Sequence, residues 1–259
     1  MKKLSSLLAL LLMFSLAANA QQFKKKLSNS AGNKVEITLS RSSFHIQGYN
    51  GNQILITAEG YKPPPAQAKG LHALYNSAVD NTGIGLSVKE NNGTVHIIKA
   101  SHDDIHYTVK LPSKVALTVN QARWGGDGIH ISNMDGELDV HSKDSNVELK
   151  NISGPVIANS TSGNITVVFN SLNQSKPTSI SDVSGNVDIT LPPASKVNFQ
   201  LRSITGEIYT DFNMKTKSEK KNGMQQLGFG NTIRSDINGG GVDMNLKSIS
   251  GNIYIRKKK

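Results

Sequence analysis

The sequence of 259 residues contains no cysteine, and this absence excludes several kinds of chemistry. A chain without cysteine forms no disulfide bond and offers no thiol nucleophile, thiolate metal site or lipid-modified cysteine. Its stability must therefore come from a buried core. A chain of this length is long enough to form such a core without a disulfide or a structural metal.

Aromatic residues and long hydrophobic runs are scarce as well. Aromatic side chains make up 5% of the chain and hydrophobic residues 37%, which is low for a compact enzyme. After the first 20 residues, no stretch approaches the roughly 20 apolar residues that a transmembrane helix needs. We therefore expect a protein that does not span a membrane. The 23 glycines are instead typical of a turn-rich β protein.

Residues 1–20, MKKLSSLLALLLMFSLAANA, have the pattern of a secretory signal peptide. Two lysines precede an apolar run over residues 7–16, and the segment ends in Ala-Asn-Ala, a typical cleavage pattern. We therefore expect export to the periplasm, the outer cell surface or the medium. The mature chain, residues 21–259, would carry 27 basic and 19 acidic side chains, a net charge of +8.

Almost all of this excess charge lies at the two ends of the mature chain. Residues 24–26 and the basic C-terminal tail, residues 256–259, together supply +7. A surface that binds nucleic acid needs a basic stripe interleaved with aromatic side chains, which neither end has, so nucleic acid is not an expected partner. We expect the basic ends to favour solubility and loose attraction to anionic envelope polymers. A third basic segment, at about residues 213–226, is predicted to be an exposed loop.

A nine-residue period organises the middle of the chain. From Gly125 onward it divides into the five units GGDGIHISN, MDGELDVHS, KDSNVELKN, ISGPVIANS and TSGNITVVF. The sixth position is mostly polar and the third is Gly, Ser or Asp, which suits a tight turn before a strand. Each unit is therefore predicted to contain one short strand with a buried and an exposed face. The fifth and seventh positions are apolar throughout: Ile129, Ile131, Leu138, Val140, Val147, Leu149, Val156, Ala158, Ile165 and Val167.

The same signature returns later as SGNVDI, TGEIYT and SGNIYI. From Gly163 the next glycines of the signature, Gly185 and Gly206, follow at nearly equal steps. The last, Gly251, follows after a step about twice as long, as if one repeat of the signature were missing. Stacked coils turn such columns into a continuous inner wall. We predict an all-β fold, a single-stranded, right-handed β-helix-like β-solenoid with about 21 residues per coil over residues 21–259. The alternative is an antiparallel β-sandwich, but that fold does not require a nine-residue repeat to stay in phase through five units.

The repeated unit S/T-G-N/E-I/V-x-I/V, and above all the ending INGGGVDMNLKSISGNIYIRKKK, resembles a bacterial family of adhesin-like, exported β-strand-repeat proteins. The family is a domain of unknown function, and the likeness covers about residues 35–259. The resemblance implies a β-repeat fold and non-catalytic binding or scaffolding at the cell envelope, with envelope glycans or another envelope protein as partners. It supplies no catalytic residues to carry over.

Six side chains form a candidate ligand surface. If two units make one coil, His130 and Glu148 stack on one outer face, while Asp139 faces elsewhere. The two tyrosines occupy the sixth position of their units and could form an outer aromatic patch. The lone tryptophan and its neighbouring arginine could stack on a sugar ring or a partner, but a Trp beside a turn more often caps the end of a core. The candidates are Arg123, Trp124, His130, Glu148, Tyr209 and Tyr254.

An enzyme is the rival interpretation, because parallel β-helices also carry polysaccharide lyases and hydrolases. Such chemistry needs two carboxylates about 5–10 Å apart, or an acid with a basic partner. The pair formed by His130 and Glu148 is explained equally well as a surface ion pair. The chain has no GxSxG, HExxH, P-loop or dinucleotide-binding motif. We therefore predict a protein that is not an enzyme.

No metal or cofactor is expected. The segment GGDG, at residues 125–128, resembles a calcium-binding nonapeptide, but its double glycine is not repeated in the following units. His102, Asp104 and His106 share one face of a predicted strand. The first and last of them would lie about 13 Å apart, too far to bind one ion. An exposed polar face is the preferred interpretation.

Overall fold

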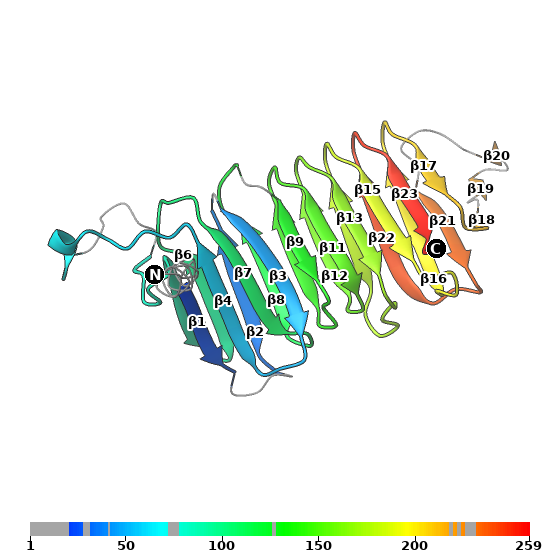
Figure 1. The fold of residues 1–259 in the computed structure, drawn as a ribbon. Coiled ribbons are helices and arrows are strands. Elements are labelled where there is room, and N and C mark those ends of the chain that lie inside the picture. Colours follow the sequence, from blue (N-terminus) through cyan, green and yellow to red (C-terminus); the bar gives the residue numbers. More distant parts are fainter. Residues whose placement is uncertain are drawn as a thin grey trace, which may run out of the picture.

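The computed structural model shows strands side by side along one elongated body, with β1 towards one end and β17 to β21 towards the other (Figure 1). The predicted signal peptide, residues 1–20, lies outside the described residues, as do two residues of the GGDG segment, Gly126 and Asp127. The structure describes residues 21–27, 32–40, 42–71, 78–125, 128–217, 220–221, 224–225 and 232–259.

Two large mixed sheets make up the body, and the all-β prediction is confirmed. Sheet A has the spatial order β1-β4-β7-β3-β9-β11-β13-β15-β23-β17. Its strands are β1 (Gln21–Lys26), β3 (Ser43–Tyr49), β4 (Gln53–Glu59), β7 (His106–Pro112), β9 (Ile129–Ser132), β11 (Val147–Ile152), β13 (Ile165–Phe169), β15 (Val187–Leu191), β17 (Ile208–Thr210) and β23 (Ile253–Lys257).

Sheet B has the spatial order β18-β21-β16-β22-β14-β12-β10-β8-β2-β6-β5. Its strands are β2 (Lys34–Leu39), β5 (Leu86–Asn91), β6 (Thr94–Lys99), β8 (Ala116–Gln121), β10 (Leu138–Ser142), β12 (Val156–Ser160), β14 (Thr178–Asp182), β16 (Val197–Ser203), β18 (Lys215–Lys217), β21 (Ile233–Ile237) and β22 (Val242–Ser248). A small hairpin, β19 (Lys220–Lys221) with β20 (Met224–Gln225), and a 3₁₀ turn, η2 (Ala66–Ala68), complete the described elements.

Each nine-residue unit forms one strand, and successive strands from β9 to β16 alternate between the two sheets. Val147 pairs in parallel with Ile129 on one side and Ile165 on the other, so neighbours within the sheet are two units apart in the sequence. The next step, from Ile165 to Val187, is longer because residues 170–177 form a longer turn. Two units therefore make one coil, and the coils of this region are shorter than predicted. Antiparallel pairs occur between β1 and β4 or β5 and β6 near one end, and between β16 and β21 near the other.

The apolar fifth and seventh positions face a core shared by both sheets. Val147 and Leu149 of β11 and Leu138 and Val140 of β10 have at most 1% of their surface exposed. Each such side chain contributes on the order of 1.5–3 kcal/mol through burial. The continuous core thus explains how a chain without disulfide bonds holds many short strands together.

The order of the coils in space differs from their order in the sequence. The last two strands insert into the stack: β22 lies between β14 and β16, and β23 lies between β15 and β17. Near the other end, β2 and β3 insert in the same way between β6–β7 and β8–β9. The long step between Gly206 and Gly251 therefore marks no missing coil, because these two glycines lie in neighbouring coils. The prediction that one repeat of the signature is missing between them was wrong.

The asparagine of the S-G-N signature links successive coils. The backbone N–H of Asn164 donates to Oδ1 of Asn146, and that of Asn186 donates to Oδ1 of Asn164, each at 2.9 Å. Asn252 continues the ladder by donating to Asn186 at 2.9 Å. Sequence reasoning gave a role to the glycine of the signature but none to the asparagine, whose side chain satisfies a backbone donor in each of these turns.

Both basic segments, residues 24–26 and the basic C-terminal tail, take part in the sheets. Lys25 lies in β1 and forms an ion pair with Glu90 of β5 at 2.7 Å. Arg256 lies in β23, and the backbone N–H of Lys258 donates to the carbonyl of Leu191. The predicted basic loop is also partly regular, since β18, β19 and β20 fall within it.

Buried serine side chains stand at the ends of several sheet B strands, where a hydroxyl group can close the following turn. Asp182 occupies one of these positions. Asp182 is 3% exposed and stands in register between Ser160 and Ser248. Among the described groups, its Oδ2 atom has no hydrogen-bond partner. Burial raises the pKa of the Asp182 carboxyl above its ordinary value. In the neighbouring coil, Ser248 performs the turn-closing role by accepting the N–H of Gly251 at 2.8 Å.

We expect Asp182→Ser to raise the free energy of unfolding by about 1 kcal/mol at pH 8, because it removes a buried, unsatisfied carboxylate oxygen. A raised pKa means that the folded state binds the proton more tightly than the unfolded state. The proton on Asp182 therefore stabilises the folded wild type fully at pH values below the ordinary carboxyl pKa. This stabilisation is lost as pH rises through the raised pKa of the folded state. The gain should be larger at pH 8 than at pH 4 in urea unfolding. A variant no more stable than wild type at pH 8 would contradict this assignment.

Candidate ligand surface on the outer face of sheet A

The sixth-position side chains of sheet A form one straight row on its outer face, which we call the outer row. The row crosses seven neighbouring strands, from β3 to β17, in direct register. It therefore brings together four of the six residues predicted from the sequence. Its members, in spatial order, are His45, His130, Glu148, Thr166, Asp188, Tyr254 and Tyr209.

The first half of the outer row is an ionic cluster. The rings of His45 and His130 stack with centroids 4.9 Å apart and planes within 5°. Nδ1 of His130 lies 3.0 Å from Oε2 of Glu148, and Nζ of Lys150 lies 2.5 Å from the other oxygen. The hydrogen bonds from Lys150 and His130 hold the pKa of the Glu148 carboxyl below its usual range. Glu148 is therefore ionised at neutral pH, as in a surface ion pair and unlike a general acid.

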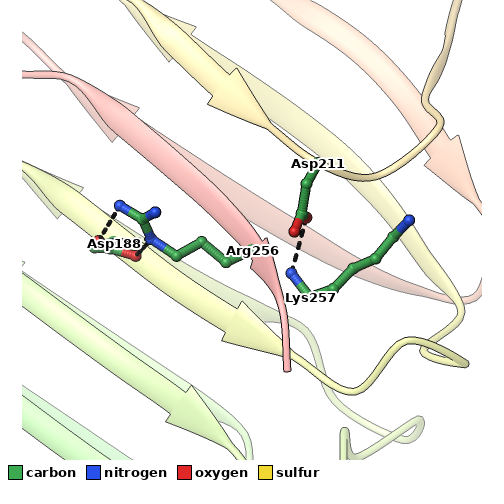
Figure 2. Close-up of polar contacts among 4 residues, drawn as sticks. All are labelled: Asp188, Asp211, Arg256 and Lys257. Atoms are coloured by element: carbon green, nitrogen blue, oxygen red, sulfur yellow. Dashed lines mark hydrogen bonds and ion pairs between the residues drawn. The ribbon is translucent and has the colours of Figure 1, made fainter. Parts of the chain in front are cut away.

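Two residues of β23 bind two carboxylates near the second half of the row, Asp188 and Asp211, as Figure 2 shows. Nε of Arg256 donates to Oδ1 of Asp188 at 2.9 Å, and its Nη2 donates to Oδ2 at 2.9 Å. The backbone N–H of Lys257 donates to the carboxylate of Asp211 at 2.8 Å. The hydrogen bonds to Asp188 raise the pKa of the Arg256 guanidinium above its ordinary value. This bidentate pair fixes the position of the arginine on the face.

An aromatic pair ends the outer row. The rings of Tyr254 and Tyr209 stack with centroids 5.4 Å apart and planes within 12°. The guanidinium carbon of Arg256 lies 5.1 Å from the centre of the Tyr254 ring, and Asn252 donates to the Tyr254 hydroxyl at 3.0 Å. Tyr209 remains 51% exposed. The structure brings the two predicted tyrosines together, and they present an aromatic surface beside a fixed cation.

The sequence model of a known family spans nearly all of this chain, at residues 15–256, and is described as Toastrack DUF4097. The chain belongs to the Toastrack DUF4097 family. This membership confirms the resemblance to an adhesin-like domain of unknown function. No curated protein matches the sequence.

Two of the solved structures that match this Toastrack chain are described as adhesion proteins. One is a candidate cell adhesion protein from Clostridium sporogenes, with 11% identity and a TM-score of 0.50, covering 93% of this chain and 100% of that one. The other is a candidate adhesin from Bacteroides fragilis, with 11% identity and a TM-score of 0.35, covering 93% of this chain and 98% of that one. At this identity, the first likeness shows the fold alone.

The other two predicted residues, Arg123 and Trp124, lie apart from the outer row of the Toastrack chain. They occupy the turn between β8 and β9, where the N–H of Gly125 donates to Asp144 at 2.7 Å. Trp124 is 60% exposed and is not part of the core. The interpretation that it caps the end of the core was therefore wrong.

The predicted polar strand face near His102 is also shorter than expected. β7 begins only at His106, so His102 and Asp104 precede the strand. Within the described ranges, no three His, Cys, Asp or Glu side chains are grouped to hold a metal ion. The same part of the Toastrack chain contains no helix long and apolar enough to cross a membrane.

Sequence reasoning missed three members of the outer row, His45, Thr166 and Asp188, and also Arg256, which pairs with Asp188. Asp188 occupies the sixth position of the SGNVDI unit, so the column of sixth positions could have found it. His45 and Arg256 come from the inserted strands β3 and β23, whose neighbours in space are distant in the sequence.

Proposed function

We propose that the chain is exported through residues 1–20, and that residues 21–259 form a non-catalytic, adhesin-like binding module of the bacterial cell envelope. The module would act in the periplasm, on the outer surface or in the medium. Family membership and the signal-peptide pattern of the N-terminal segment support this class of function. A glycan of the envelope, or another envelope protein, is the partner class that the proposal assigns.

The observation that carries the proposal is the outer row. Seven strands about 4.8 Å apart give the row a length of roughly 29 Å. Backbone ladders and ion pairs hold its side chains in place, so little conformational entropy is lost when a partner binds. The exposed Tyr209 beside Tyr254 and Arg256 supplies the aromatic and arginine groups that are enriched among binding hot spots.

The geometry of the outer row favours binding over glycoside hydrolysis. Hydrolysis needs one carboxylic acid that stays protonated near neutral pH. Both carboxylates of the row are instead paired with cations, Glu148 with Lys150 and Asp188 with Arg256. The lowered pKa of Glu148 is opposite to what a proton donor needs.

A binding assay with separated envelope components tests the proposal. Peptidoglycan sacculi, lipopolysaccharide vesicles and solubilised envelope proteins would be immobilised separately and exposed to the purified chain. We expect at least one of them to bind the wild type. We expect Tyr209→Ala/Tyr254→Ala to bind it at least about tenfold more weakly, because the aromatic anchor is lost.

Trp124→Ala is the matched control, because it removes an exposed aromatic ring outside the outer row. It should bind within about twofold of the wild type. A reducing-sugar assay on the same sacculi and vesicles should detect no release of chain ends. Binding to none of the three components, equal binding by the double variant, or steady release of reducing ends would each reject the proposal.

A further inference from the structure

A polar groove lies at the edge of the body, where sheet A strands turn towards sheet B. It has a cavity volume of about 440 Å³, which falls within the range of roughly 300–1,000 Å³ that is usual for ligand sites. The groove shares no residue with the outer row. Its lining comes from the ends of five neighbouring strands, β7, β3, β9, β11 and β13, so it is about 19 Å long at ~4.8 Å per strand.

Short turns run along most of this edge, with one longer turn at its β13 end. After β9 and β11 the chain crosses to sheet B within five and three residues, at 133–137 and 153–155. Residues 50–52 form the three-residue turn after β3, the strand next to the β7 end of the groove. At the other end, residues 170–177 form the longer turn after β13. Only the turn after β13, with eight residues, is longer than the other turns along the groove.

The lining of the groove is rich in side-chain amides. Asn151 donates to Oδ1 of Asn133 at 3.1 Å, which leaves the Asn133 amide nitrogen and the Asn151 oxygen uncommitted within the described structure. Asn170 accepts from Nζ of Lys258 at 3.2 Å and keeps its own N–H donors. Asn50 makes no side-chain hydrogen bond to any described residue. The groove therefore offers free donors and free acceptors along its whole length.

Backbone conformation explains only two of these asparagines. Asn133 and Asn151 have φ values of 58° and 55°, where asparagine is favoured over most other residues. Asn50 and Asn170 do not have positive φ, so the backbone places no such requirement on them. The Asn50 amide and the N–H donors of Asn170 are therefore available for contact with a ligand.

A fixed aromatic ring and a single charge complete the groove. The hydroxyl of Tyr49 donates to the carbonyl of Gln53 at 2.9 Å and accepts its N–H at 3.2 Å, which fixes the ring. Asp135, which accepts from the hydroxyl of Ser113 at 2.9 Å, is the one charged residue among the described lining residues. The lining itself holds no cation, and the ammonium of Lys258 contacts it at Asn170, at the β13 end, so an anionic ligand would meet the Asp135 carboxylate elsewhere along the groove.

We propose that this groove binds a neutral, hydroxyl-rich glycan chain. A sugar hydroxyl both donates and accepts, as the amides of Asn133, Asn151 and Asn170 do. The apolar C–H face of a sugar ring packs against an aromatic ring such as Tyr49. The length of the groove suits several sugar units in a row. This site is independent of the function proposed for the outer row.

Calorimetric titration tests the proposal with four defined probes: cellotetraose, maltotetraose, chitotetraose and tetragalacturonate. We expect at least one of the three neutral tetrasaccharides to bind the exported protein, more tightly than tetragalacturonate does. Asn50→Ala/Asn170→Ala should weaken that binding at least tenfold. Both positions are exposed and lack positive φ, so the thermal midpoint should stay unchanged.

Two control variants separate this site from the rest of the molecule. Asn245→Ala removes an asparagine from the outer face of sheet B and should bind the same tetrasaccharide within twofold of the wild type. Tyr209→Ala/Tyr254→Ala should also bind it normally, so failure of the outer-row proposal does not affect this one. The proposal is overturned if no neutral probe binds, if tetragalacturonate binds more tightly, or if the double asparagine variant binds as well as the wild type.

Discussion

Gly163→Val is expected to lower the free energy of unfolding by about 3 kcal/mol or more. Gly163 has a φ of +133°, a conformation that a β-branched residue rarely adopts. A Cβ atom there would also lie 2.7 Å from the backbone carbonyl oxygen of Ser145 in the neighbouring coil. Backbone strain and overpacking therefore act together, and neither a rotamer change nor a small side-chain shift can relieve a contact with backbone.

Gly239→Val separates these two causes. Gly239 has a φ of +85°, but a Cβ atom at this position would meet nothing within 4 Å. We expect it to cost about 1–2 kcal/mol through backbone strain alone. Urea unfolding of both variants measures the difference, with an unchanged slope showing that the same surface is exposed. Equal midpoints for Gly163→Val and Gly239→Val would show that the coils are not packed closely at Gly163.

The sequence was most informative where neighbours in space are a fixed distance apart along the chain. The nine-residue columns predicted the buried positions of β9 to β13 and the outward pairing of His130 with Glu148, because both depend on one repeated step. The same columns predicted that Tyr209 and Tyr254 both face outward, but only the pairing of β17 with β23 brings the two rings together. The local period determines whether a side chain points into the core or outward. The register between strands then aligns the outward side chains of neighbouring strands.

The inserted strands could not be predicted in this way. Val187 of β15 pairs with Ile253 of β23, although the two are far apart in the sequence and no period of the chain predicts the pairing. The units after Gly185 and Gly206 carry the same signature as the unit after Gly251, so the signature alone gives no spatial order. The pairing of Asp188 with Arg256 on the outer row depends on this insertion, and it was missed for the same reason.

Ile253→Ala tests the insertion directly and is expected to cost about 3–4 kcal/mol. Ile253 is fully buried in β23, between β15 and β17, and lies in register with Val187 and Ile208. Shortening the side chain to alanine leaves a cavity between the two adjacent coils. The neighbouring side chains are packed on both sides and cannot move in to fill this cavity. If the coils instead followed sequence order, β23 would lie at an open end of the stack, and the loss would be smaller.

Ile208→Ala is the matched control, since it makes the same substitution at the same register position one strand away. Ile208 is only partly buried and lies in β17, the edge strand of sheet A. We expect it to cost about 1 kcal/mol, because part of its side chain is already in contact with water and only one neighbouring strand covers it. In a sequentially wound stack, β17 would be interior and β23 terminal, so the two costs would exchange rank. The order of the two urea midpoints therefore distinguishes an inserted final coil from a terminal one.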